Sequence, residues 1–228
     1  MAHELDRPVW HALTTRHAAL AVGDARAVRY APAVSQFAAA PDGGPASVAA
    51  LAALAAPGDG LIFMQAEAPP RLPGFEVLVA DAAVQMVGDA VAEPPDDPLI
   101  VALCETDAPE MLELALLTKP GPFTLKSLAL GRFWGVRENG RLIAMAGERL
   151  GFPGHTELSG LCTHPDHRGR GLGRALLTFV SARIRESGDL PFLHAWASNT
   201  GAIALYETMG YRHRAMLRIA FVRRPAEG

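Results

Sequence analysis

The chain is poor in the residues that mark disulfide-rich, zinc-binding and nucleic-acid-binding proteins. Only two cysteines, Cys104 and Cys162, occur in 228 residues. Their wide separation excludes a disulfide framework and a cysteine-based zinc site, and it fits a reducing cytoplasm. The formal net charge is -3, so no excess of positive charge draws the chain to nucleic acid or to an anionic membrane. We therefore expect no metal and no nucleic-acid partner.

Long apolar runs are also absent. The longest, ASVAALAALAAPG at residues 46–58, is far shorter than the ~20 residues that a membrane-spanning helix needs. The amino-terminal residues are charged and interrupted by Pro8, unlike a secretory signal. These features predict a cytoplasmic protein without membrane contact. Lysine is rare too: Lys119 and Lys126 stand among many arginines, a composition that favours a GC-rich bacterial source.

Hydrophobic residues make up 50% of the chain, enough for one large core or two small ones. The sequence AEPPDDPL at residues 92–99 breaks the apolar pattern and predicts a linker. We expect a smaller α/β domain at 1–95 and a second domain at 96–228. In the first, the patterns predict helices at 7–20 and 45–58, a strand at 26–32, a strand at 60–67, and strands at 75–80 and 83–87.

The second domain has a more regular pattern. Asp107 followed by Glu110 predicts a capping box at the start of a helix, and Asn139-Gly140 predicts a hairpin between two strands. The expected order is β-α-(α)-β-β-β-α-β-α-β, a mixed α/β fold. Its strands are expected at 99–105, 132–138, 141–150, 155–165, 191–198 and 214–222, and its helices at 107–119, 171–188 and 199–210.

Three glycines at alternate positions, Gly169, Gly171 and Gly173, precede the helix expected at 171–188. Glycine at a helix start lets an anion approach the unpaired amides, and the helix dipole favours negative charge there. Arg168, Arg170 and Arg174 add positive charge. This pattern predicts a pyrophosphate-binding loop, although a glycine-rich turn before an ordinary helix is the simpler interpretation of the loop alone.

Two common phosphate motifs do not fit. The dinucleotide fingerprint requires a glycine where Arg174 stands, and the Walker motif requires a lysine that the loop lacks. The segment instead matches R-x-x-G-x-G, and residues 199–211 match N-x-x-A-x-x-x-Y-x-x-x-G-Y. Together these motifs resemble the GNAT superfamily of acyl-CoA N-acyltransferases over residues 99–222. The resemblance implies the GNAT fold for the second domain and acetyl-CoA as co-substrate, with no metal.

The resemblance also implies roles for individual residues. The backbone of the strand before the loop would pair with the pantetheine arm, the loop amides would hold the phosphates, and Asn199 would cap its helix, contact the cofactor arm, or do both. The implied cofactor-binding residues are Leu161, Cys162, Thr163, Arg168, Gly169, Arg170, Gly171, Leu172, Gly173, Arg174 and Asn199. We expect the Cys162 side chain to be a small buried group without covalent chemistry.

Tyr206 falls at the family position of the acid that protonates the departing thiolate. A tyrosine hydroxyl has a pKa near 10 and a thiol a pKa near 8.5. The tyrosine is therefore protonated at pH 7 and can donate its proton to a departing sulfur within hydrogen-bond reach; packing in the core is the alternative role. The acceptor amine must lose a proton before it attacks. Glu157 is the first candidate for that base and His155 the second, and a solvated strand charge is the alternative for Glu157. His164 and His167 are expected to be surface residues.

The first domain carries no motif with chemical meaning. Some members of the superfamily contain a degenerate copy of the fold before the working one, and residues 1–95 resemble such a copy, which would shape the acceptor side. The leading hypothesis is an N-acetyltransferase that modifies a primary amine of a small molecule, amino acid or peptide. The alternatives are a non-catalytic acyl-CoA-binding sensor or scaffold, and a protein that binds another phosphate ligand such as a nucleotide. The oligomeric state stays open.

Overall fold

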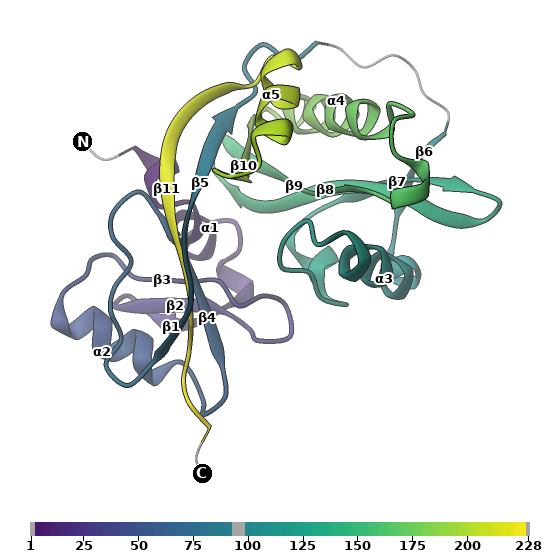
Figure 1. Ribbon diagram of the computed structural model, residues 1–228. Helices are drawn as coiled ribbons and strands as arrows, with labels where there is room; N and C mark the ends of the chain where they lie inside the picture. The colour runs from purple at the N-terminus through teal and green to yellow at the C-terminus, as the bar shows by residue number, and fades with distance from the viewer. Residues whose placement is uncertain (1–2, 93–98, 227–228) are drawn as a thin grey trace. The chain divides into compact units, whose positions relative to one another are not determined.

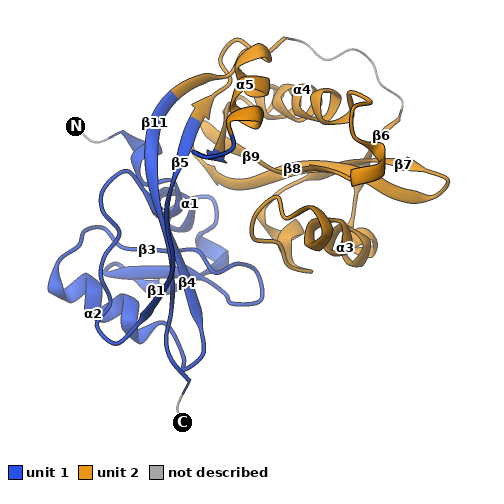
Figure 2. Ribbon diagram, in the orientation of Figure 1, with its two compact units in different colours: residues 1–85, 195–199, 214–228 blue, residues 86–194, 200–213 orange. Residues whose placement is uncertain are grey.

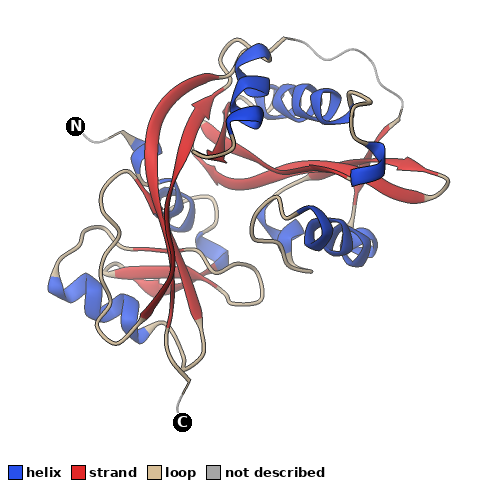
Figure 3. Cartoon of the chain, in the orientation of Figure 1, coloured by secondary structure: helices blue, strands red, loops and turns tan. Residues whose placement is uncertain are grey.

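The computed structural model describes residues 3–92 and 99–226 (Figure 1). These residues form two compact units, one of residues 1–85, 195–199 and 214–228 and the other of residues 86–194 and 200–213 (Figure 2). Helices and strands alternate through both (Figure 3). The predicted linker at 92–99 falls largely on residues 93–98, outside the described residues.

The first unit combines short helices with two groups of strands. Strands β1, β2 and β3 form an antiparallel sheet, and β4 pairs antiparallel with β11, which lies next to β5. Its elements are η1 (Glu4–Asp6), α1 (Pro8–Thr14), η2 (Ala18–Leu20), β1 (Ala21–Asp24), β2 (Ala27–Tyr30), β3 (Ala38–Ala39), α2 (Pro45–Ala53), β4 (Gly60–Gln65), most of β5 (Glu76–Val87) and most of β11 (Arg212–Arg223). The carboxyl-terminal strand thus belongs with the amino-terminal residues, because it pairs with β4.

Two expectations for the first unit need correction. The helix predicted at 7–20 ends at Thr14, where the Thr14 hydroxyl donates to the Trp10 carbonyl at 2.7 Å; such side-chain bonds to the backbone weaken the next helical turn. The strands predicted at 75–80 and 83–87 form one strand, β5. The unit's core gathers apolar residues, mostly alanine and leucine, from its strands, from α2 and from the loops that follow them: Ala27, Ala38, Ala40, Leu51, Ala55, Leu61, Phe63, Leu72 and Val222.

The second unit is built on a sheet with the strand order β10-β9-β8-β7-β6. Neighbouring strands are antiparallel except β9 and β10, which are parallel. Its elements are β6 (Ile100–Leu103), η3 (Glu105–Asp107), α3 (Ala108–Thr118), η4 (Ser127–Leu130), β7 (Phe133–Glu138), β8 (Arg141–Phe152), β9 (His155–Thr163), η5 (Pro165–His167), α4 (Leu172–Glu186), β10 (Leu190–Trp196) and α5 (Thr200–Thr208). The predicted mixed α/β class and element order are confirmed.

Helices α3 and α4 cover opposite faces of this sheet (Figure 1). Helix α4 buries Leu176, Leu177, Val180 and Ile184, the apolar face that its period predicts. On the other face, α3 contributes Met111, Leu114 and Ala115 to a core with residues of the sheet. The sheet is therefore buried between two helical layers, and its strand ends lie next to the loops that connect those layers.

Two local predictions in this unit have opposite outcomes. The hairpin is confirmed: Asn139 and Gly140 have φ of 51° and 81°, and Glu138 pairs with Arg141, as a type I′ turn requires. The capping box of Asp107 and Glu110 is wrong. Asp107 accepts a hydrogen bond from the Cys104 amide at 2.8 Å, and Glu110 instead binds the Arg137 guanidinium at 2.6 Å. The ion pair between Glu110 and Arg137 of β7 therefore replaces the predicted helix cap.

Candidate active site

The loop between β9 and α4 holds the glycine motif. Gly169 and Gly171 have φ of 76° and 79°, left-handed values that glycine adopts without strain. A Cβ atom at either position would meet none of the described atoms within 4 Å. Backbone conformation thus explains two of the three glycines. The third, Gly173, lies inside α4, where a Cβ would lie 3.9 Å from the Thr163 hydroxyl. The loop keeps the start of α4 clear of side chains.

The start of α4 has the geometry of an anion site. The first helical hydrogen bond runs from the Ala175 amide to the Gly171 carbonyl at 3.0 Å, so the amides of Leu172, Gly173 and Arg174 have no acceptor within the helix. The aligned peptide dipoles place partial positive charge at this end. A phosphate group fits this arrangement.

The three arginines of the motif differ in their contacts. Arg168 is exposed. Arg170 donates to Glu138 Oε1 and to His167 Nδ1, both at 2.8 Å, and we call Glu138, His167 and Arg170 the loop cluster. Arg174 donates to the sulfur of Met209 and to the Thr208 hydroxyl. The loop's charges are thus partly used to hold the loop and α5 in place.

A surface cavity of about 630 Å³ adjoins the start of α4. This volume lies within the usual range of ligand sites, about 300–1,000 Å³. Its walls come from the first turns of α4, the end of α5 and residues just before and at the start of the predicted linker: Ala90, Ala92, Gly171, Arg174, Ala175, Thr178, Glu207, Thr208, Met209 and Gly210. There is therefore room beside the loop for a group much larger than a phosphate.

Strand β9 separates from β10 partway along its length. The described ladder between them covers three pairs, which end at Phe192 opposite Glu157. Gly160 then adopts φ 65°, and one extra residue enters β9 between its pairs with Gly147 and Met145 of β8, a β-bulge. Beyond the bulge, the backbone of residues 161–163 continues past the end of the β10 ladder, where an extended ligand can add as a strand.

Glu157 lies at the point where the ladder ends. Its carboxylate is fully buried and accepts two hydrogen bonds from Arg149, at 2.7 and 2.6 Å. The same carboxylate lies 2.6 Å from His194 Nδ1. We call Arg149, Glu157 and His194 the strand cluster. The alternative of a solvated strand charge is wrong, because Glu157 is 0% exposed.

Two opposing effects set the protonation of Glu157. Burial by itself raises the pKa of this carboxyl, but the charges and hydrogen bonds of Arg149 and His194 outweigh burial and lower the pKa to about 2. Glu157 is therefore a permanent anion at neutral pH. A carboxylate with so low a pKa is a weak proton acceptor.

His194 was missed by the sequence analysis, which named His155 instead. His155 stacks on Phe152, with ring centroids 5.1 Å apart, and its Nδ1 lies 3.3 Å from the Pro153 carbonyl. The parallel register brings His194 to Glu157 from β10. A signal was present: His194 is a polar residue between apolar neighbours in PFLHAW.

Tyr206 lies on α5, with its ring centroid 6.3 Å from that of Tyr211. Burial raises the pKa of its hydroxyl above the ordinary value of 10, so the group is protonated at neutral pH. Asn199 directly precedes α5 and belongs to the first unit. The structure places Tyr206, Glu157 and the loop residues 161–174 in the second unit.

Neither the cysteine nor the histidine pair of this region shows metal or covalent chemistry. Burial raises the pKa of the Cys162 thiol to about 11, so the thiol is protonated and unreactive at neutral pH. His164 accepts from the Asp166 amide at 3.3 Å and His167 belongs to the loop cluster. His164 is 8% exposed, so the expectation that it is a surface residue is wrong. Among the described residues, no group of three or more His, Cys, Asp or Glu side chains is arranged to hold a metal ion.

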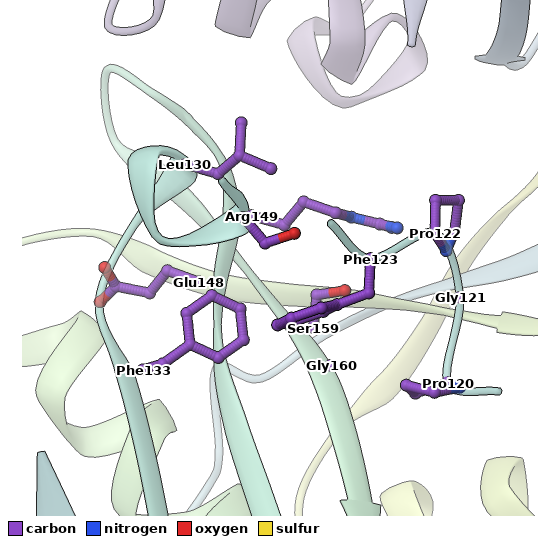
Figure 4. A pocket seen from close by; sticks show the side chains of 11 residues that line it. Pro120, Gly121, Pro122, Phe123, Leu130, Phe133, Glu148, Arg149, Ser159 and Gly160 are labelled. Carbon is purple, nitrogen blue, oxygen red and sulfur yellow. The ribbon is translucent and has the colours of Figure 1, made fainter. Parts of the chain in front are cut away.

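A small pocket lies beside the bulge of β9 (Figure 4). The rings of Phe123 and Phe133 meet edge to face at 5.6 Å, and the Arg149 side chain extends past Phe123 (Figure 4). The cavity measures about 10 Å³, at most about the space of one water molecule. Its lining is Pro120, Gly121, Pro122, Phe123, Ser127, Leu130, Phe133, Glu148, Arg149, Ser159 and Gly160.

The described β10 ladder thus ends on β9 beside a glycine-rich helix start, an arrangement that suits an extended ligand with a phosphate group. Comparison with known proteins specifies the class. The family model of FR47-like proteins matches residues 133–219. A GNAT-family protein from Novosphingobium aromaticivorans is 42% identical, with both chains fully covered and a TM-score of 0.90. This chain therefore belongs to the GNAT family and is an N-acetyltransferase, and the expected GNAT fold is confirmed.

Two further relatives extend the comparison. The Escherichia coli K12 [ribosomal protein bS18]-alanine N-acetyltransferase is 29% identical over 125 residues, which cover 52% of this chain and 84% of that protein. The GCN5-related N-acetyltransferase of Kribbella flavida is 18% identical, with a TM-score of 0.62 over 96% of this chain and 93% of its own, and shares the fold. Within residues 3–92 and 99–226, no helix has the length and hydropathy that a bilayer crossing requires.

Proposed function

We propose that this acetyltransferase transfers the acetyl group of acetyl-CoA to a primary amine of a small molecule, an amino acid or a peptide. The observation that carries the proposal is the divergence of β9 from β10. The stretch of β9 beyond its described ladder with β10 leads from the start of α4, which suits a phosphate, to the buried strand cluster, which carries acid-base groups. The proposed phosphate site, the strand edge and the acid-base groups thus lie one after another along a short segment.

The GNAT family uses acetyl-CoA as co-substrate, and the described residues fit this molecule. In the proposal, backbone groups of Leu161, Cys162 and Thr163 pair with its pantetheine arm, and the amides of residues 168–174 bind its diphosphate. The left-handed glycines support this role, because they remove side chains from the surface over the helix start. The cavity of about 630 Å³ beside Arg174 is large enough for its nucleotide part.

Tyr206 is the proposed acid. The amine nitrogen attacks the thioester carbon, a C–N bond forms, the C–S bond breaks, and the sulfur leaves with the bond's electron pair. The Tyr206 hydroxyl donates its proton to this thiolate. The raised pKa of Tyr206 keeps that proton in place until sulfur departs. The acceptor nitrogen in turn releases two protons, one before the attack and one from the tetrahedral intermediate.

The acceptor is proposed to carry a small group next to its amine. The E. coli relative acts, by its name, on an alanine of ribosomal protein bS18. An alanine amine, free or at the start of a peptide, is therefore the first acceptor to test.

The test is acetyl transfer to a defined panel of amines. Purified protein is incubated with acetyl-CoA and, separately, the twenty amino acids, trialanine, spermidine and tyramine, and the release of free thiol is measured. We expect turnover with alanine-type amines. Tight binding of acetyl-CoA without thiol release for every amine would contradict the proposal.

Tyr206→Phe sharpens the test. We expect kcat to fall about 100-fold while KM for acetyl-CoA stays unchanged. Tyr211→Phe is the matched control, because Tyr211 is buried nearby and its hydroxyl lies 2.7 Å from Ser181 Oγ. An unchanged kcat in Tyr206→Phe would remove this residue from the reaction.

A further inference from the structure

The strand cluster contains a second titratable group besides Glu157. His194 follows the last ladder pair of β10 by two residues, so its ring lies where β9 and β10 separate. Its side chain is 4% exposed and Glu157 is fully buried. Both groups are therefore buried at the point where the described ladder between β9 and β10 ends.

The hydrogen bond between the two residues fixes the tautomer of His194. An ionised carboxylate can only accept hydrogen bonds, so the Nδ1 atom that lies 2.6 Å from Glu157 Oε1 is the protonated nitrogen. In a neutral imidazole, the other nitrogen, Nε2, then carries the lone pair. The ring is thus held in the form that accepts a proton at Nε2.

Glu157 is poorly placed to accept that proton itself. Each of its oxygens already accepts a hydrogen bond from Arg149, at 2.6 and 2.7 Å, and Oε1 also faces His194. Protonation of Glu157 would remove the negative charge that faces the buried guanidinium. Protonation of His194 instead places an imidazolium beside a carboxylate, an arrangement that stabilises the new charge.

We infer that His194 is the base that removes the proton from the acceptor amine, with Glu157 and Arg149 as its positioning residues. This inference rests on the proposed function. The ammonium form of the acceptor gives one proton to His194 Nε2, and the neutral amine then attacks the thioester carbon. The proton leaves His194 for solvent after the product departs. The second nitrogen proton restores the Tyr206 hydroxyl, so the net products are the amide, the free thiol and one proton.

The deciding experiment is the pH profile of kcat for His194→Gln, with acetyl-CoA and the fastest amine of the panel. We expect kcat to fall about 100-fold, with KM for acetyl-CoA within about two-fold of wild type. In wild type, kcat should rise with pH on the acid side of the profile, which we call the acid limb, and then reach a plateau. In His194→Gln, the residual rate should rise with pH without that plateau, because only the acceptor's own deprotonation remains.

Two comparisons keep the result specific. His213→Gln, on the exposed start of β11, should leave kcat and the pH profile unchanged. Glu157→Gln should lower kcat, because the carboxylate that holds the ring and faces its charged form is gone. Thermal melts of each variant identify losses that come from unfolding, which change the amplitude of the profile but not its shape.

The inference is overturned if His194→Gln keeps kcat within about three-fold of wild type, or if kcat falls but the acid limb and plateau remain. It is also overturned if His155→Gln, and not His194→Gln, loses the limb. Wild-type protein that transfers acetyl to none of the amines would overturn the proposed function itself, a result that is independent of any variant. The inference is supported if the acid limb is lost in His194→Gln and in neither of the other two histidine variants.

Discussion

The loop cluster and the strand cluster contain the same three residue types in opposite surroundings. In the loop cluster, Glu138 is 39% exposed in its side chain and Arg170 is 48% exposed. In the strand cluster, Glu157 is 0% exposed and Arg149 is 12% exposed in its side chain. Exposed pairs contribute little to stability because water competes for both charges. Removing one partner of a buried pair leaves the other charge buried without a partner, which costs stability.

This difference separates two uses of the same chemistry. The Arg170 hydrogen bond lowers the pKa of the exposed Glu138, and the group remains in contact with solvent. The buried Glu157 depends on Arg149 and His194 for its charge. We expect the loop cluster to adjust the position of a binding loop at little cost, and the strand cluster to be essential both to the fold and to proton transfer.

The largest expected effect is that of Glu157→Gln on stability. The substitution removes the carboxylate that Arg149 contacts with two hydrogen bonds, and we expect a loss of about 3–5 kcal/mol. In a chain of this size, that corresponds to a fall in Tm on the order of 10 °C. Thermal and urea unfolding measure it. A Tm within about 2 °C of wild type would show that the buried pair does not hold the strands together.

The pH dependence of stability sharpens the same point. The pKa of Glu157 falls from the ordinary 4.5 to about 2 on folding, so the unfolded chain binds this proton more readily than the folded chain. Its stabilisation is fully present above pH 4.5 and is lost as the pH falls toward 2. The loss is about 3 kcal/mol.

Urea unfolding at a series of pH values tests this sign directly. The difference in unfolding free energy between wild type and Glu157→Gln should shrink as the pH falls from 4.5 toward 2. A difference that stays constant across this range would contradict the assignment of a low pKa to Glu157.

Gly171→Ala is expected to have an intermediate effect, confined to the loop. Alanine at φ 79° costs about 1–2 kcal/mol, and its Cβ occupies the surface where we place the diphosphate. We expect Kd for acetyl-CoA to rise about 10-fold. Gly58→Ala is the matched control, since Gly58 has φ 87° and an equally open surround in the first unit. Equal effects of both variants on Kd would remove the loop from the site.

The smallest expected effect is that of Glu138→Gln. The Glu138 carboxylate is exposed, so Tm should stay within about 2 °C of wild type. Release of Arg170 should change Kd for acetyl-CoA by less than about three-fold, and added salt should reduce that change. A fall in Tm as large as that of Glu157→Gln would abolish the contrast between the two clusters.

Much of the loop region could be predicted because its signals are local. The helix start at Gly171 and its end near Gly188 follow from backbone conformations that glycine alone adopts readily, and α4 spans Leu172–Glu186 as expected. The Asn139-Gly140 turn is equally local. In each case, neighbouring residues in the sequence supply the whole physical cause.

The strand cluster could not be predicted because its causes are not local. Glu157 and His194 are 37 positions apart, and they meet only through the parallel register of β9 and β10, which α4 connects. Alternation along β9 identified Glu157 and His155 as neighbours on one face, but it carries no information about the next strand. The capping prediction at Asp107 failed for the same reason, since Arg137 of β7 binds both acids.

The most direct test of the account is an NMR titration of ¹⁵N-labelled protein with coenzyme A. We predict the largest shifts at the amides of residues 161–163 and 168–174, together with a change at the His194 ring, because the proposal places the diphosphate at the start of α4 and the thiol where the described β9–β10 ladder ends. Shifts confined to other parts of the chain, with these amides and His194 unchanged, would contradict the central claim.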